Sequence, residues 1–467
     1  MSEPQALIKV AVCNVAQLLS GKNIQVQDQA DIQGKLTIPE YQRPYVWDIE
    51  QLDQLIKDIQ EHEQKGKDSP YYLGSIILHA KSTELNIIDG QQRLTSLTLF
   101  GYLNAQLQNV SLSYHSSVSV EHIRRNLAYL HSNKAEWEKS IDLEKIVVSL
   151  VVTSSEDDAY KFFETQNTGG VRLSGIDIIK AYHLRAINSE QQKRYQTFYA
   201  KKWESLGELS DTVWVLLLGR YWNYLNRQQV PYYKNKMAIK NAIIDEFSKK
   251  TRNGTEDIAY SQININYSPV NRSSQISMLN SYNFRQSLNA GINTISYLEY
   301  FQQLYLKYYK NLDIQYLYEY YNFTSWLKQL QGCRFLAELY VIGILLYVSK
   351  FGEYKLDIFA KKFFRVAYSR RATNQTRVRA DTVPKFIEET NLLDHVVMAY
   401  RPEDLFEKLD SYKFDLKEYE LDEKKKSLRK TFIQETIKYF GLNLKSEEIQ
   451  QCFFKELTLK IKYLDKK

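Results

Sequence analysis

The spacing of apolar residues changes part-way along the chain. Up to about residue 185, short apolar runs typical of strands alternate with segments that carry apolar residues every three or four positions, as amphipathic helices do. This alternation predicts a domain of mixed helices and strands. The predicted strands are 36–39, 71–78, 85–88 and 146–153, and the predicted helices are 49–59, 93–107 and 157–166.

Beyond residue 185 the strand signals become sparse and long amphipathic stretches dominate. Glycine (17) and proline (8) are few for 467 residues, which also favours a helix-rich chain with few tight turns. We therefore predict an α+β chain, with a mixed domain at 1–185 and a mostly helical domain at 186–467 that contains a polar loop at 268–277. The predicted helical stretches are 193–225, 295–328, 331–351, 353–370 and 383–397.

Charge and cysteine content narrow the class of protein only a little. The net charge of +7 permits nucleic-acid binding without requiring it. The three cysteines lie far apart, in no metal-binding or disulfide spacing, which is usual in a reducing compartment. The most apolar internal stretch, 340–348, is far shorter than the ~20 residues of a membrane span and is predicted to be a buried helix. These features predict a cytoplasmic protein with no membrane partner.

One short segment between a predicted strand and a predicted helix carries candidate chemistry. It reads Asp89-Gly90-Gln91-Gln92-Arg93. A glycine lets the backbone approach an anion at the positively polarised start of a helix, and an arginine can hold two phosphate oxygens at once. An acid at this place is able to hold Mg²⁺ or to orient a water. The alternative is that Asp89 only caps the helix and Arg93 is a surface residue; these five residues alone leave both interpretations open.

A second segment, 38–47, reads I-P-E-Y-Q-R-P-Y-V-W. Its two prolines favour an extended loop. Tyr41, Arg43, Tyr45 and Trp47 offer a cation among aromatic rings, which suits a nucleobase. The alternative is that these rings only pack the loop onto the core.

A third segment, 163–174, has an asparagine and two glycines just after a predicted helix. A glycine pair in this place is often only a helix end. Asn167 and Arg172 are also placed to close over a ligand, and Ser174 with Asp177 predicts a capping box for the next helix.

The order of these segments resembles the N-terminal domain of GmrSD-type modification-dependent (type IV) restriction proteins, from about Ile38 to His183. The shared motifs are I-P-x-Y-Q-R-x-Y-x-W, Y-L-G-S-I-I-L, I-I-D-G-Q-Q-R-L-T-S-L and F-x-x-x-N-x-x-G-x-x-L-S. The resemblance implies a ParB/sulfiredoxin-like fold that binds and hydrolyses an NTP with Mg²⁺, coupled to recognition of modified DNA. It implies catalytic roles for Asp89, Gln92 and Arg93 with Asp89 on the metal, nucleotide contacts from Gly90, Gln91, Arg43 and Asn167, and a pocket made by Tyr41, Gln42, Tyr45 and Trp47.

The second half of the chain departs from relatives that end in an HNH-type nuclease domain. After residue 185 the only histidine is His395, in an apolar neighbourhood with no proline nearby in the expected place. We therefore predict that this chain does not cut DNA itself and works with a nuclease-bearing partner. Five arginines are predicted to contact the DNA backbone, the alternative being a solvated helix end: Arg365, Arg370, Arg371, Arg377 and Arg379.

The function predicted from the sequence is an NTP-binding, NTP-hydrolysing sensor or regulatory subunit of a restriction system in phage defence. A homo-oligomer is compatible with this prediction. Two alternatives stay open: a non-catalytic module that binds nucleotide or DNA, and a complete nuclease whose active site has diverged.

Overall fold

The computed structural model describes residues 8–26, 30–65, 69–107, 112–166, 174–187, 193–225, 227–268, 273–311, 317–373, 378–416 and 427–466. The chain forms two compact units, Met1–Glu204 and Ser205–Lys467. The boundary predicted at residue 185 lies before helix α8 (Lys193–Ser205), which almost entirely falls within the first unit. Each unit is described by itself.

The N-terminal unit is built on a five-stranded mixed sheet with the strand order β1-β5-β3-β4-β2. The pairs β1–β5 and β3–β4 are antiparallel, whereas β3–β5 and β2–β4 are parallel. The strands are β1 (Ile8–Asn14), β2 (Lys35–Thr37), β3 (Tyr71–Lys81), β4 (Glu84–Asp89) and β5 (Ile146–Thr153).

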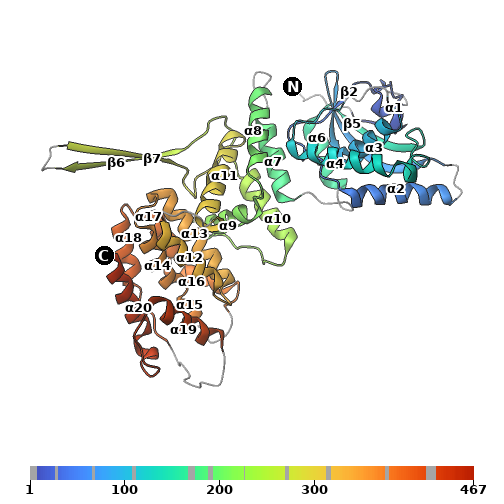
Figure 1. Ribbon diagram of the computed structural model, residues 1–467. Helices are drawn as coiled ribbons and strands as arrows, with labels where there is room; N and C mark the ends of the chain where they lie inside the picture. Colours follow the sequence, from blue (N-terminus) through green and yellow to red (C-terminus); the bar gives the residue numbers. More distant parts are fainter. Residues whose placement is uncertain are drawn as a thin grey trace. The chain divides into compact units, whose positions relative to one another are not determined.

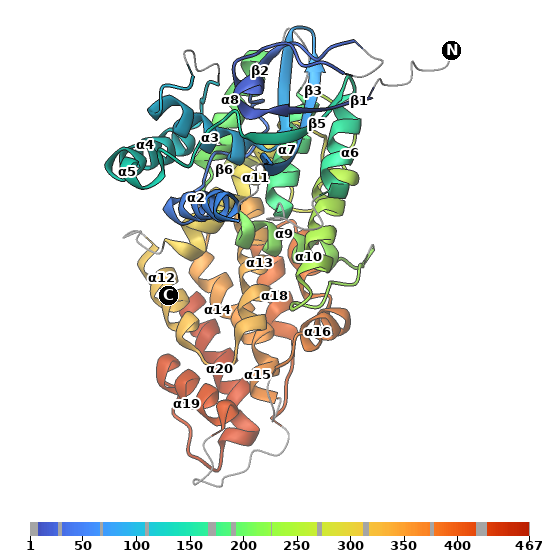
Figure 2. The ribbon, with the colours of Figure 1, turned by 90° about the vertical axis from the view of Figure 1, so that its right-hand side faces the viewer.

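Helices cover both faces of this sheet (Figures 1 and 2). One face packs on the first four helices around Leu78, Ile87 and Val148, which are buried completely. The other face carries α6, which contacts β3, β4 and β5. The helices are α1 (Val15–Leu19), α2 (Ile49–Gln64), α3 (Gln91–Leu103), α4 (Ser117–Ser132), α5 (Lys134–Trp137), α6 (Glu156–Gln166) and α7 (Gly175–Ala186).

The prediction of a mixed N-terminal domain and a mostly helical remainder is confirmed. The strand predicted at 146–153 is β5, and the capping box of Ser174 and Asp177 is formed at the start of α7. Strand β1 was not predicted. Its exposed residues Val10 and Val12 are apolar, and the polar residues Lys9 and Asn14 interrupt the run, so the sequence lacks the alternation of apolar and polar residues that marks a strand.

Helix α13 (Arg334–Phe351) is the central element of the second unit, as its apolar composition predicts. It contacts several helices, and Leu345 is buried completely. Within the described residues, no helix combines the length and apolar character needed to cross a bilayer. The other helices are α9 (Ser210–Tyr221), α10 (Lys236–Ile244), α11 (Ile292–Tyr305), α12 (Tyr318–Gln329), α14 (Leu356–Ala367), α15 (Ser369–Thr373), α16 (Thr382–Thr390), α17 (Leu392–Met398), α18 (Pro402–Ser411), α19 (Leu428–Phe440) and α20 (Ile449–Asp465), with π-helical turns η2 (Asp245–Lys249) and η3 (Leu306–Lys310).

A two-stranded hairpin interrupts the helices of the second unit. Strands β6 (Tyr260–Ser268) and β7 (Ser273–Ser281) pair antiparallel over nine residues each and extend away from the helices (Figure 1). The loop predicted at 268–277 is therefore wrong in part, since 273–277 belong to β7. Serines and asparagines in this stretch are typical of turns, and they concealed a strand whose pairing is purely local.

Candidate functional site

The junction between β4 and α3 is a sharp turn that only glycine fits. Gly90 has a φ of +94°, in the region that favours glycine, and forms the N-cap of α3. A Cβ at this position would lie 2.1 Å from the Cδ1 of Ile76 on the neighbouring strand. The turn thus brings the backbone at the start of α3 close against the sheet.

The start of α3 has no side-chain cap among the described residues, and its first turn holds no acidic residue. Asp89 therefore does not cap this helix, so the alternative in which Asp89 serves only as a helix cap does not hold. The N–H groups of a first helical turn carry partial positive charge and attract anions. This helix end is consequently suited to a phosphate or carboxylate group.

Arg93 is held by the fold on three sides. Its Nη2 donates to Asp89 at 3.0 Å and to the carbonyl of Ser75 at 2.9 Å, and its Nη1 donates to the carbonyl of Leu73 at 3.3 Å. The guanidinium packs so closely on the β3 bulge that a Cβ at Gly74 would lie 2.6 Å from Nη1. Arg93 thus fixes the bulge of β3 to the first turn of α3, and its side chain is only 25% exposed.

Only one of the two carboxylate oxygens of Asp89 is used in its bond to Arg93. Its Oδ2 accepts the bond from Arg93, while the side chain as a whole is 27% exposed. Within the described residues no cluster of three or more His, Cys, Asp or Glu side chains surrounds it. Because Mg²⁺ commonly takes one or two protein carboxylates and completes its shell with phosphates and water, Asp89 fits such an ion only together with a bound nucleotide.

The two glutamines of the segment have different environments. Gln92 anchors the loop at 38–47: its Oε1 accepts from the N–H of Val46 at 2.9 Å, and its Nε2 donates to the carbonyl of Pro44 at 3.0 Å. These bonds use both the oxygen and the nitrogen of its amide and tie the start of α3 to the loop, while the catalytic role of Gln92 stays a prediction. Gln91 is 5% exposed, and its Oε1 has no hydrogen-bond partner among the described residues. An unpaired buried acceptor is costly, which makes Gln91 a candidate ligand contact.

Gln42 ties the same loop to the end of β4. Its Nε2 donates to the carbonyls of Ile87 and Ile88 at 2.8 and 2.6 Å. Arg43 therefore lies between two residues, Gln42 and Pro44, that bond to either side of the Gly90 turn. Arg43 is partly buried and makes no ion pair or hydrogen bond within the described residues. It is the arginine of this region whose guanidinium is available to an incoming anion.

The aromatic residues of the loop mostly pack it onto the fold. Tyr45 is completely buried, and its hydroxyl lies 2.9 Å from the Oγ of Ser96 and 3.0 Å from the Nδ2 of Asn126. Trp47 is partly buried against the core. The predicted base pocket is thus wrong for Tyr45, because no surface of its ring is left for a ligand.

Tyr41 belongs to a polar cluster that the sequence did not indicate. Its ring lies edge-on to Tyr160 of α6 with the centroids 5.7 Å apart, and the guanidinium of Arg185 stacks 4.2 Å from the Tyr160 centroid. Arg185 also lies 3.6 Å from a carboxylate oxygen of Glu156. Burial raises the pKa of Tyr41 well above its ordinary value, with Tyr160 and Glu156 adding to the effect. Helices α6 and α7 are joined to the loop here.

Lys180 of α7 makes a second connection to the loop. Its side chain is almost fully buried, with Nζ 3.4 Å from the carbonyl of Gln42 and 3.6 Å from a carboxylate oxygen of Glu204. Burial lowers the pKa of this lysine, which Glu204 and Asp177 partly counteract. Nothing in the local sequence distinguishes Lys180 from a surface lysine, since only the packing of α7 buries it.

The Gly90 turn and the 38–47 loop lie within a segment that matches a family model. Residues 15–184 match the family model of the GmrSD restriction endonuclease N-terminal domain. The resemblance inferred from the motifs is thereby confirmed. A model for a family of unknown function (DUF7834) matches residues 195–426, and no curated protein matches the chain.

Two residues of the sequence prediction fall outside the described part of this GmrSD-like domain. Asn167, predicted to contact the nucleotide, and Arg172 lie outside the described residues. The described part brings together Asp89, Gly90 and Gln91 with the backbone of the 38–47 loop.

The predicted DNA-binding arginines of the second unit divide into two kinds. Arg365 and Arg371 are 2% and 0% exposed, and Arg365 donates to the carbonyls of Leu409 and Tyr412. The prediction is wrong for these two, because a buried guanidinium does not reach a phosphate. Arg370 is 30% exposed and pairs with Glu389, whereas Arg379 is exposed with no ion pair within the described residues. Arg377 lies outside the described residues.

Proposed function

We propose that this chain is an NTP-binding and NTP-hydrolysing component of a modification-dependent restriction system, acting in phage defence. The match of its first unit to the GmrSD restriction endonuclease N-terminal domain supports a role in restriction. The sheet and α3 would then form a ParB/sulfiredoxin-like nucleotide fold, with the phosphates at the Gly90 turn.

The observation that carries this proposal is the combination at the start of α3. The start of α3 is an uncapped helix end, Gln91 has a buried acceptor without a partner within the described residues, and Arg43, which makes no ion pair there, lies between two residues that bond to either side of the Gly90 turn. A phosphate would accept from the helix N–H groups and from Arg43. A ribose hydroxyl or a metal-bound water would donate to Gln91.

Each residue then has a defined role in the proposed reaction. Mg²⁺, when bound with the nucleotide, would offset phosphate charge in phosphoryl transfer. Asp89 would hold this ion through its second oxygen or orient the attacking water. Arg93 and Gln92 would act as positioning residues that keep the β3 bulge and the loop in place.

The second unit is the proposed DNA-binding part, in agreement with its charge. Residues 205–467 contain 40 Lys and Arg against 30 Asp and Glu, a net +10, whereas residues 1–204 contain 22 against 25, a net −3. A strong charge asymmetry between halves is typical of nucleic-acid binding by the basic half. Arg370 and Arg379 are the candidate backbone contacts that remain. We also propose a separate nuclease-bearing partner, because His395 has an apolar setting unlike that of a catalytic histidine.

The test is phosphate release from ATP, GTP, CTP and UTP with Mg²⁺, with and without plain or modified duplex DNA. The variant is Arg43→Met, and the matched control is Arg124→Met, another arginine of the first unit, exposed and without an ion pair within the described residues. A charge-assisted bond contributes about 1.5–3 kcal/mol, so nucleotide affinity should fall roughly 10- to 100-fold in Arg43→Met only.

The outcomes separate the candidate functions. Hydrolysis by wild type and its loss in Arg43→Met support the proposal. Nucleotide binding by calorimetry without hydrolysis favours the non-catalytic module instead. If wild type binds no nucleotide, the proposed site is wrong, and cleavage of DNA by the purified chain alone would show that a nuclease site was missed.

A further inference from the structure

A cavity between α12 and α19 is a feature of the second unit that the proposed function does not use. Its volume is about 260 Å³, just below the roughly 300–1,000 Å³ of most ligand sites. This size suits a single planar ring with a small substituent rather than a whole nucleotide. The cavity is lined by Trp326, Gln329, Leu330, Gln331, Leu428, Thr431, Phe432 and Glu435.

One wall of the cavity is aromatic and is held in place by packing. Trp326 of α12 stacks on Tyr439 of α19, with the ring centroids 4.2 Å apart and the planes 23° from parallel. Phe432 of α19 is 4% exposed, and its centroid lies 6.1 Å from that of Phe364 on α14. The wall therefore needs little ordering when a ligand binds. Aromatic side chains of this kind pack against the ring of a base.

The polar side chains of the cavity have unused hydrogen-bonding capacity. Within the described residues the carboxylate of Glu435 makes no hydrogen bond and no ion pair, and the side-chain amides of Gln329 and Gln331 make no hydrogen bond. The indole N–H of Trp326 has no partner there either. The cavity thus offers one anionic acceptor and several neutral donors.

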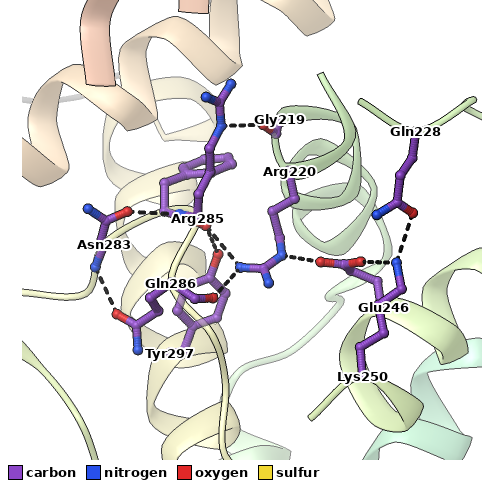
Figure 3. A network of polar contacts seen from close by, with 10 residues as sticks. Gly219, Arg220, Gln228, Glu246, Lys250, Asn283, Arg285, Gln286 and Tyr297 are labelled. Atoms are coloured by element: carbon purple, nitrogen blue, oxygen red, sulfur yellow. Dashed lines mark hydrogen bonds and ion pairs between the residues drawn. The ribbon is translucent and has the colours of Figure 1, made fainter. Parts of the chain in front are cut away.

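The polar groups at the core of the same unit are in the opposite condition (Figure 3). Arg220 donates to the carboxylate of Glu246 at 2.6 Å, and Arg285 donates to the carbonyls of Gly219 and Trp222 at 2.9 and 2.6 Å. These bonds are made within the fold and leave little for a ligand. Unused polar groups beside an aromatic wall are therefore a distinguishing property of the cavity.

The charge of the cavity decides which chemical class fits it. Within the described residues no lysine or arginine lines it, and Glu435 makes it negative. A phosphate is repelled by such a lining, whereas a ring that donates hydrogen bonds is favoured. Carboxylates accept from the exocyclic amine of cytosine, and glutamine bonds the amine edge of adenine.

The helix that forms one side of the cavity also packs against a candidate contact for the DNA backbone. Helix α19 contacts α15, which carries Arg370. Arg429, next to the lining residue Leu428, donates to the carbonyl of Ala372 in α15. A phosphate contact and a base contact are thus available on two helices that are bonded to each other.

We propose that this cavity takes up one unstacked DNA base that bears an exocyclic amine, cytosine or adenine. Glu435 accepts from the amine, Gln329 and Gln331 bond the rest of the ring edge, and the rings of Trp326 and Phe432 pack against the base. Turning a base out of the stack costs least where it is mismatched or unpaired. The inference takes its partner, DNA, from the proposed function, but it requires no hydrolysis step.

The experiment measures binding of the full chain to fluorescent 30-base-pair duplexes that differ only in one bulged position, by anisotropy at fixed salt. The bulge is cytosine, 5-hydroxymethylcytosine, adenine, thymine or an abasic sugar, so the phosphate backbone is the same in all five. The variant is Glu435→Ala. The matched control is Glu407→Ala, an exposed glutamate on helix α18 of the same unit with no hydrogen bond or ion pair within the described residues.

We expect wild type to bind at least one amine-bearing bulge about fivefold or more tighter than the thymine and abasic bulges. Glu435→Ala should reduce this preference to within about twofold, and Glu407→Ala should retain it. Each variant removes one negative charge, which by itself strengthens binding to DNA. A loss of affinity in Glu435→Ala alone is therefore not an effect of total charge.

The aromatic wall is tested with Trp326→Leu, which should lose the preference for any base over the abasic sugar. Because this variant also loses the stack on Tyr439, urea unfolding is measured beside it, and if it does not fold, Glu435→Ala decides alone. The cytosine, 5-hydroxymethylcytosine and adenine bulges distinguish which amine-bearing base the cavity accepts.

Three results would overturn the proposal: equal binding of all bulges by wild type, equal effects of Glu435→Ala and Glu407→Ala, or no binding of any duplex. Phosphate release from NTPs by the same preparations is measured in parallel. A base preference without hydrolysis supports the cavity and counts only against the nucleotide site, so the two failures are distinguishable.

Discussion

The arginines discussed in the two units differ in whether their guanidinium groups are already hydrogen-bonded within the protein. Arg43 lies partly exposed beside the uncapped start of α3 and makes no ion pair within the described residues. Arg220, Arg285 and Arg365 of the second unit are inside the protein and donate to backbone carbonyls and carboxylates. The first is a cation available to a ligand, whereas the others are cross-links of the fold.

The difference shows why an arginine in a sequence is not by itself a phosphate site. A guanidinium has five N–H groups in a fixed plane, which suits it equally to phosphate oxygens and to the free carbonyls at a helix end. What decides its role is whether those groups are already satisfied. Arg93 illustrates this point. It belongs to the motif of the candidate site, but its N–H groups already donate to two carbonyls of β3 and to Asp89.

The largest predicted effect concerns a buried cross-link. Arg285→Met should destabilise the second unit by about 3–5 kcal/mol, because it leaves the Asp394 carboxylate and two carbonyls buried without their donor. Urea unfolding followed by far-UV circular dichroism measures this loss, and hydrogen exchange of α9 peptides locates it. Arg252→Met, an exposed arginine of the same unit, is the control and should change stability by less than about 0.5 kcal/mol. Similar effects of the two variants would show that the Arg285 bonds contribute little.

The second prediction concerns the turn that positions the candidate site. Gly90→Ala should cost about 2–3 kcal/mol, since an alanine there is strained at a φ of +94° and its Cβ would lie 2.1 Å from the Cδ1 of Ile76. Gly21→Ala is the control: its φ is +67° with nothing within 4 Å of the added Cβ, so only backbone strain of about 1 kcal/mol is expected.

The steric part of this effect is separable. Adding Ile76→Val removes the Cδ1 atom, so the double variant should be less destabilised than the sum of the two single variants. Urea unfolding of the four proteins gives the coupling. Strict additivity would mean that the backbone shifts to avoid Ile76 and that the turn is less rigid than its geometry indicates.

Much of the fold was predictable because its signals are local. The valine-rich run of β5 and the capping box of α7 need only neighbouring residues, and both were predicted. The hairpin strand β7 was not, since its serines and asparagines favour turns and the strand exists only through pairing with β6. Local patterns therefore fail where a strand is specified by its pairing and not by its own sequence.

The candidate site was predictable in place but not in detail. The Asp89 to Arg93 segment marks the turn correctly as strand, glycine and helix. Which of its polar residues are already bonded depends on segments distant in sequence: Gln92 is occupied by Val46, and Lys180 is buried by contact with Gln42. Long-range partners of this kind leave no trace in the spacing of residues along the chain.

The smallest predicted effect concerns Arg370, which is partly exposed and is also ion-paired. Arg370 is 30% exposed, pairs with Glu389, which is 59% exposed, and lies 5.2 Å from the ring centroid of Phe386. Ion pairs of this exposure contribute about 0–1 kcal/mol, so Arg370→Ala should reduce stability by less than about 1 kcal/mol. The part due to the ion pair should vanish in urea unfolding at 1 M salt, where charges are screened beyond about 3 Å.

DNA binding by the Arg370→Ala variant shows whether Arg370 is available to a ligand or serves as a cross-link of the fold. If it behaves as Arg43 is proposed to, its alanine variant loses affinity for duplex DNA and lowers the salt dependence of binding by about one counterion, with little change in stability. If it behaves as Arg285 does, stability falls and affinity follows only as the unit unfolds. Glu389→Gln distinguishes the two further, because releasing Arg370 from its carboxylate should strengthen DNA binding only if the guanidinium reaches a phosphate.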